Sequence, residues 1–164
     1  MDRQQIALKL TIDGLGLHFN IDAFDDRLIL QKAVYLAQAI GVNLGYYYQW
    51  YIHGPYSPTL TQDEYAIAVE LGQDIDESKG WILDSVSQDR LKNLMNLIPK
   101  SGKKEVSRKL VLLASVHFLV SRKQIHISEA KEMSTTLKKF GKDFSEEEVR
   151  EAARELQLYG LLTG

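Results

Sequence analysis

The sequence predicts an α+β fold that is mainly helical: a single compact domain with a small β-sheet and a C-terminal winged-helix-like helix-turn-helix. Most of the chain places apolar residues at the spacing of helices that bury one face. One short segment, residues 46–53, is instead rich in aromatic residues and lies between glycines, which is typical of a strand. Near the C-terminus, two helical stretches are followed by a glycine and two leucines, the order of a winged helix-turn-helix.

The first half of the chain is predicted to hold three helices around the aromatic strand. Residues 1–15 and 25–40 show helical periodicity, and a glycine ends each stretch. Ser57 is a good helix N-cap, and Pro58 is tolerated at the first helical position because an N–H there would have no partner. We therefore expect a third helix from Pro58 to Leu71.

The second half is predicted to contain a short strand at residues 81–83 and helices at 85–98, 104–121, 128–140 and 145–159. The last helix begins with a capping box, Ser145 and Glu148, and Leu161 could begin a strand after it. The stretch PKSGKKE at 99–105 has the composition of an exposed loop and divides the chain into residues 1–98 and 99–164. We expect these two parts to share one hydrophobic core.

The composition is typical of a protein of the reducing cytoplasm. The chain has 164 residues and no cysteine, which excludes disulfides and thiolate zinc sites. Its N-terminal segment carries charges where a signal peptide needs an apolar run. The longest apolar run, 110–120, is much shorter than the roughly 20 residues that cross a bilayer. We expect a cytoplasmic protein with no membrane contact, no metal and no cofactor.

Charge is distributed unevenly along the chain. Residues 62–90 carry eight acidic and two basic side chains, and residues 100–123 carry seven basic and one acidic side chain. One interpretation is that these blocks are complementary faces of one molecule. The other is that the basic block meets a polyanion or an acidic partner.

The segment GYYYQWYIHGPYSP, residues 45–58, is the most distinctive feature of the sequence. In a strand, Tyr46, Tyr48, Trp50 and Ile52 would face the core, and the alternate side chains would face outward. Tyrosine offers a large rigid contact area with a polar tip, so it is common at recognition surfaces. Three polar residues of the preceding helix share one stripe that could extend this surface. The candidate protein-binding residues are Tyr47, Tyr51, His53 and Tyr56, joined by Gln31, Tyr35 and Gln38.

The turn after the strand has a tightly constrained backbone. It is formed by Gly54, Pro55, Ser57 and Pro58, and glycine and proline restrict the conformations of their neighbours. We interpret it first as a joint that docks the next helix. A second interpretation is that the helix N-terminus, with its free N–H groups, holds a carboxylate or phosphate beside His53 and Tyr56.

The sequence favours a non-catalytic role. Its histidines lack the spacing of a metal site, and no nucleophile elbow, phosphate loop or dinucleotide fingerprint is present. The alternative function is a nucleic-acid-binding regulator. The last predicted helix carries five glutamates and two arginines, so it would repel phosphates. The candidate nucleic-acid-binding residues are instead Lys100, Lys103, Lys104, Arg108, Lys109, Arg122 and Lys123.

Residues 27–65 resemble the small YwgA-like proteins and, more distantly, the Panacea or SocA-type domains of phage-associated and antitoxin proteins. The resemblance is carried by the helix RLILQKAVYLAQ, the aromatic strand and the glycine-proline turn that leads to a helix. For Panacea-type domains it implies that the chain neutralises a toxin, or presents it to a protease, by protein–protein contact without catalysis. The winged-helix-like tail departs from a plain Panacea domain. The expected partner is therefore another protein, with a toxin as one candidate and a second copy of the chain as another.

Overall fold

The computed structural model of the chain describes residues 1–163. Its elements in chain order are α1 (Arg3–Gly14), α2 (Phe24–Ala39), β1 (Gln49–Tyr51), β2 (Gly54–Tyr56), α3 (Pro58–Gly72), α4 (Ser85–Met95), α5 (Lys103–Ser121), α6 (Ala130–Lys139) and α7 (Glu146–Leu158). The fold is therefore a mainly helical α+β fold with one small antiparallel sheet, as the sequence predicts. No helix among these elements is both long enough and apolar enough to cross a membrane.

Side-chain caps explain where several helices begin. Ser57 accepts a hydrogen bond from the Leu60 amide and Pro58 is the first residue of α3, as predicted. The predicted capping box of α7 is also present, with Ser145 and Glu148 bonded to each other's backbone N–H. These local signals are independent of tertiary packing, which is why the sequence locates the helix starts well.

The sheet is a two-stranded hairpin, and it differs from the predicted strand. β1 pairs antiparallel with β2, and Trp50 lies opposite Pro55. The predicted strand 46–53 is therefore shortened to three residues, and the predicted turn at Gly54 and Pro55 forms part of the second strand. Residues 81–83 form no strand. Leu161 and Leu162 also form no strand, and their side chains are buried.

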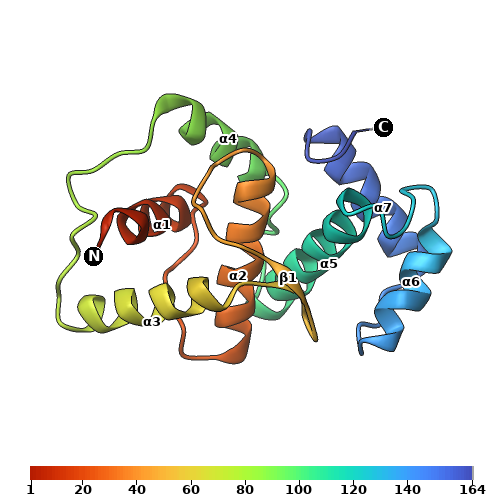
Figure 1. Cartoon of the computed structure of the whole chain (residues 1–164), viewed down its shortest axis with the longest axis horizontal. Coiled ribbons are helices and arrows are strands. Elements are labelled where there is room, and N and C mark those ends of the chain that lie inside the picture. Colours follow the sequence, from red (N-terminus) through yellow and green to blue (C-terminus); the bar gives the residue numbers. More distant parts are fainter. Residues whose placement is uncertain (164) are drawn as a thin grey trace.

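Helix α5 lies at the centre of the molecule and joins the two halves of the chain. Figure 1 shows α5 between α2 on one side and the α6–α7 hairpin on the other. From Leu110 to Leu119 every residue of this helix is buried. Its side chains belong to the same hydrophobic cluster as those of α1, α2 and α7. Residues 1–98 and the described residues after them therefore share one core.

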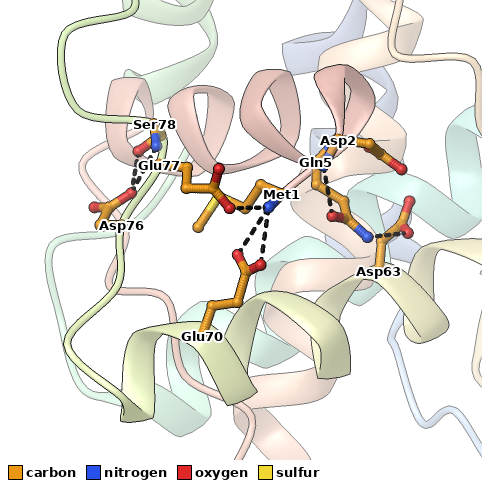
Figure 2. Close-up of polar contacts among 8 residues, drawn as sticks. All are labelled: Met1, Asp2, Gln5, Asp63, Glu70, Asp76, Glu77 and Ser78. Atoms are coloured by element: carbon orange, nitrogen blue, oxygen red, sulfur yellow. Dashed lines mark hydrogen bonds and ion pairs between the residues drawn. The ribbon is translucent and has the colours of Figure 1, made fainter.

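A polar cluster fastens the start of α1 to α3 and to the connector that follows α3 (Figure 2). The α-amino group of Met1 forms an ion pair with Glu70 at 2.8 Å and a second one with Glu77. Hydrogen bonds to these two carboxylates raise the pKa of the amino group. Gln5 of α1 donates to Asp63 of α3 at 2.9 Å. These contacts set the position of α3, which forms one wall of the site described next.

Candidate functional site

A cavity of about 400 Å³ opens between α2, the β1–β2 hairpin and α3. We call it the aromatic recess. Cavities of this size, with apolar walls and a few polar groups, are typical of ligand sites in proteins. It is lined by Phe24, Arg27, Leu28, Gln31, Lys32, Tyr51, Ile52, His53, Tyr56, Thr61, Glu64 and Tyr65.

The rim of the aromatic recess is apolar and open to solvent. The exposed fraction of the side chain is 50% for Phe24, 45% for Tyr51, 71% for Ile52 and 49% for Tyr65. Edge-to-face contacts link the Tyr51 ring to a second tyrosine of the hairpin and the Phe24 ring to His53. Several large apolar side chains grouped around one cavity mark an interaction surface more strongly than the same residues scattered singly.

The floor of the recess holds two ionisable side chains. Lys32 of α2 and Glu64 of α3 are each only 1% exposed. The Lys32 ammonium donates a hydrogen bond of 2.7 Å to the carbonyl of Pro55 in β2. Oε1 of Glu64 has no hydrogen-bond partner among the described residues, and the two side chains form no ion pair with each other.

Burial shifts the pKa of both floor residues towards their neutral forms. Desolvation, with a smaller contribution from the charge of Lys142, lowers the pKa of Lys32 to about 7. Desolvation raises the pKa of Glu64 to about 8, although the charges of Lys32 and Arg27 oppose the shift. Near neutral pH, Glu64 is therefore a carboxylic acid that can donate a hydrogen bond, and Lys32 gains or loses its proton easily.

The structure brings Gln31 and three of the four predicted residues of the aromatic segment to the recess and places the fourth, Tyr47, elsewhere. Tyr51, His53 and Tyr56 all line the aromatic recess. Tyr47 is 66% exposed, but it lies in a different shallow depression beside Arg122. The predicted alternation is present up to Tyr51 and ends at Ile52, which is exposed because the hairpin turns there.

The three helix residues predicted to extend the surface have other contacts. Gln31 is buried, and its amide pairs with both the N–H and the carbonyl of Ser57 at 3.0 and 2.9 Å. Gln38 pairs in the same way with Tyr46 at 2.8 and 2.9 Å. Tyr35 is also buried, and its hydroxyl lies 2.7 Å from Nδ1 of His117. Gln31 and Tyr35 therefore do not form an exposed polar stripe, because α2 is covered by the aromatic segment and by α5.

The turn residues fix the hairpin against α5 and α3. Gly54 has a φ of +90°, a conformation that favours glycine, and a Cβ there would lie 2.7 Å from Oγ of Ser115. Pro55 accepts the hydrogen bond from Lys32, and Ser57 caps α3. Lys142, from the connection between α6 and α7, donates to the carbonyl of Ile52.

Four of the seven basic residues predicted as a nucleic-acid-binding patch contact groups within the chain. Lys103 pairs with Asp26 at 3.0 Å, Arg108 with Glu148 at 2.9 Å and Lys109 with Glu155 at 2.6 Å. Arg122 lies over the ring of Phe118 and donates to the carbonyl of Tyr48. Lys100, Lys104 and Lys123 are exposed and form no ion pair within residues 1–163.

Sequence reasoning missed the floor of the recess and three of the four rim residues, since Ile52 was predicted to face the core. Glu64 had a recognisable signal, because it lies at helical spacing between the buried residues Leu60 and Ile67 and so at a core position of α3. Lys32 had no such signal, because at 100° per residue it lies outside the apolar arc of α2 and beside the polar stripe. Phe24 and Tyr65 had none, since an isolated exposed aromatic residue is common in any sequence.

The polar residues of the described chain do not form a recognisable metal site. No group of three or more histidine, aspartate or glutamate side chains within residues 1–163 is arranged to hold a metal ion.

Comparison of the chain with protein-family models, with curated proteins and with solved structures finds no match in any of the three.

Proposed function

We propose that this chain is a non-catalytic protein-interaction module, antitoxin- or adaptor-like, that holds a segment of a partner protein in the aromatic recess. The observation that carries the proposal is the group of four large apolar side chains, each about half exposed or more, around one cavity. Burying such side chains against a partner contributes roughly 25 cal/mol for each Å² removed from water. Aromatic anchors of this kind often supply most of the affinity of an interface.

The recess is built to keep its shape before a partner arrives. Lys32 and Gln31 of α2 hold β2 and the residue after it, and Lys142 holds the turn between the strands. A rigid binding surface loses less conformational entropy on association than a flexible loop. This supports recognition by a preformed surface.

The resemblance to the YwgA-like and Panacea or SocA-type proteins supports the same class of function. The segment that carries it includes the LQK sequence of α2 and the turn from Gly54 to Pro58. In the structure these residues form a wall, part of the floor and the hairpin of the recess. The resemblance and the geometry therefore point to the same surface, and a toxin of the cytoplasm is the candidate partner.

An affinity-capture experiment with two matched variants tests the proposal. Ile52→Asp places a charge on the rim, and Ile82→Asp places the same charge on the exposed connector before α4, away from the recess. We expect the wild-type chain and Ile82→Asp to capture the same protein in stoichiometric amounts, and Ile52→Asp to lose it. Circular dichroism should show that all three proteins remain folded, because both isoleucines are largely exposed.

Three further outcomes decide the proposal. If the captured protein inhibits growth, co-expression of the wild-type chain but not of Ile52→Asp should relieve the inhibition, as an antitoxin requires. Retention of the partner by Ile52→Asp would rule out the recess as the binding surface. If the wild-type chain captures only a second copy of itself, the chain forms a homodimer and the proposal of a different partner protein fails.

The alternative, a nucleic-acid-binding regulator, would use the lysines that remain free of ion pairs at the start of α5. An electrophoretic shift series against salt decides it, because binding through phosphates weakens steeply as salt rises. A shift at low salt that is lost in the Lys100→Glu, Lys104→Glu variant would favour the alternative. No shift at low salt would exclude this surface.

A further inference from the structure

The floor of the aromatic recess has hydrogen-bonding capacity that the chain itself does not use. Oε1 of Glu64 is buried and has no partner among the described residues. Lys32 uses one hydrogen bond, to Pro55, although an ammonium group has three N–H donors. Unpartnered buried polar groups cost free energy, so they are rare in proteins unless a bound group completes them. Both residues belong to the lining of the cavity, at its buried base.

The charges around the floor favour an anion. Arg27 and Lys32 of α2 line the recess, and the Lys142 ammonium donates to the carbonyl of Ile52, which also lines it. Burial and the charges of Lys142 and Lys32 lower the pKa of His53, so its neutral form is favoured. Glu64 is the one carboxyl group in the lining, and its burial favours its neutral form. A cationic ligand would therefore meet two basic groups and a neutral acid. An anionic ligand would favour the protonated form of Lys32 and accept hydrogen bonds from Lys32 and from the neutral acid.

We propose that the recess binds the C-terminal carboxylate of a partner chain whose last residue has an apolar side chain, an inference that rests on the function proposed above. Lys32 donates to one carboxylate oxygen and protonated Glu64 donates to the other. The apolar side chain packs against Tyr51, Ile52 and Tyr65 at the rim. A chain end suits this arrangement because one residue carries both the carboxylate and the apolar group. A cavity of about 400 Å³ holds one or two residues of this kind.

The test compares two probes that differ in one group. N-acetyl-Leu-Phe with a free carboxylate and the same dipeptide with a C-terminal amide are titrated separately into the wild-type protein. Binding is followed through the backbone amide signals of the hairpin and α3 in NMR spectra. We expect the acid to shift these signals and the amide to bind at least about tenfold more weakly, since a charge-assisted pair is replaced by a neutral one. Equal binding of the two probes, or no binding of the acid, overturns the proposal.

The dependence on pH gives a second readout that needs no variant. Between pH 7 and pH 9 Lys32 and the neighbouring Lys142 lose their charges and Glu64 loses the proton that it donates, whereas the carboxylate of the probe stays ionised. Affinity for the acid should therefore fall as pH rises through this range. An affinity for the acid that rises with pH would show that neither protonated Lys32 nor protonated Glu64 holds the carboxylate and would overturn the proposal. Phenylpropionate, a free acid without a peptide group, is the third probe. If it binds as tightly as the dipeptide acid, the ligand is a small carboxylic acid and not the end of a partner chain, which overturns the proposal.

Two variants assign the roles of the floor residues. Lys32→Met keeps the length of the side chain and removes its charge, so it should abolish the preference for the acid over the amide. Glu64→Gln keeps a donor, so it should retain that preference. If Lys32→Met does not fold, the comparison of acid and amide on the wild-type protein still decides the proposal. If affinity capture identifies a partner whose binding survives removal of its last residues, the carboxylate proposal fails while the proposed function stands.

Discussion

Gly54 shows how a single residue fixes the recess. Its φ of +90° is strained for a residue with a side chain, and an added Cβ would also lie 2.7 Å from Oγ of Ser115 in α5. We expect Gly54→Ala to lower the free energy of unfolding by about 1–3 kcal/mol in urea denaturation. The loss has two causes, the backbone conformation and the close contact.

A double variant separates these two causes. Ser115→Ala removes the hydroxyl that the added Cβ would contact. In the Gly54→Ala chain it should recover the loss of unfolding free energy that the close contact causes and leave the loss that the backbone conformation causes. Ser115→Ala alone should have a small effect, because its Oγ has no hydrogen-bond partner among the described residues. Unchanged stability of Gly54→Ala would mean that the hairpin does not need this backbone conformation.

Glu64 should make stability depend on pH in a direction that is unusual for a carboxylate. Its pKa is raised from 4.5 to about 8, so between these values the folded state binds more protons than the unfolded state. The contribution of Glu64 to the free energy of unfolding therefore falls as pH rises, by up to about 1.4 kcal/mol per pH unit. Glu64→Gln removes this dependence. We expect the stability of this variant relative to wild type to increase by about 2–3 kcal/mol between pH 5 and pH 7.

Urea denaturation of both proteins at the two pH values measures this change. The chosen window lies below the range in which Lys32, with a pKa lowered to about 7, acts in the opposite direction. Glu105→Gln, at the exposed start of α5, is the control, and its stability relative to wild type should be the same at both pH values. If the difference in unfolding free energy between Glu64→Gln and wild type is also the same at both pH values, Glu64 is ionised in the folded protein.

At the scale of elements, side chains of α2 position the aromatic segment by pairing with its backbone N–H and carbonyl groups, as a neighbouring strand would. Gln31 and Gln38 lie two helical turns apart on one face, and each pairs with the N–H and the carbonyl of a single residue in the segment. Lys32 adds a hydrogen bond to Pro55 between these two points. A hairpin of two short strands is marginally stable alone, so this helix supplies what further strands would supply in a larger sheet.

Loss of one glutamine should loosen one end of the segment. Gln31→Leu keeps the volume and leaves the buried N–H of Ser57 without a partner, while the Ser57 carbonyl keeps only its hydrogen bond from the Thr61 N–H, so we expect a loss of about 1–3 kcal/mol in the free energy of unfolding. Hydrogen exchange should become faster at the start of α3 and in β2. Gln49→Leu, on the exposed face of β1, is the matched control and should change neither quantity. Equal effects of the two variants would show that the pairing with Ser57 does not hold the turn.

At the scale of the whole molecule, the sequence predicted the helices well and the packing of the aromatic segment poorly. Helical periodicity and capping residues are local, so α3 and α7 begin where Ser57 and Ser145 indicate. The second strand was missed because Gly54 and Pro55 are typical of turns, and its formation depends on hydrogen bonds from α2. Contacts such as the one between Lys142 and Ile52 join distant parts of the chain, and no spacing in the sequence predicts them.

The same distinction applies to the candidate site. Tyr51, His53 and Tyr56 could be predicted because aromatic density is visible in the sequence. Their placement beside Glu64 could not, because it depends on how α3 packs against the hairpin. Gln31 and Tyr35 are buried and not part of an exposed stripe for one reason: α2 is covered on more of its surface than a single apolar arc implies.

Because α5 packs against both α2 and the C-terminal hairpin, the molecule should unfold as one unit. Leu113 in α5 is fully buried in the common core, and Leu113→Ala should lower the free energy of unfolding by about 2–5 kcal/mol. The loss should appear equally in the hydrogen exchange of slowly exchanging amides in α2 and in α7. Val69→Ala, on the exposed face of α3, should change both by much less. If Leu113→Ala accelerates exchange in α7 and leaves α2 protected, residues 1–98 form a core that is stable without α5, and the aromatic recess does not depend on the second half of the chain.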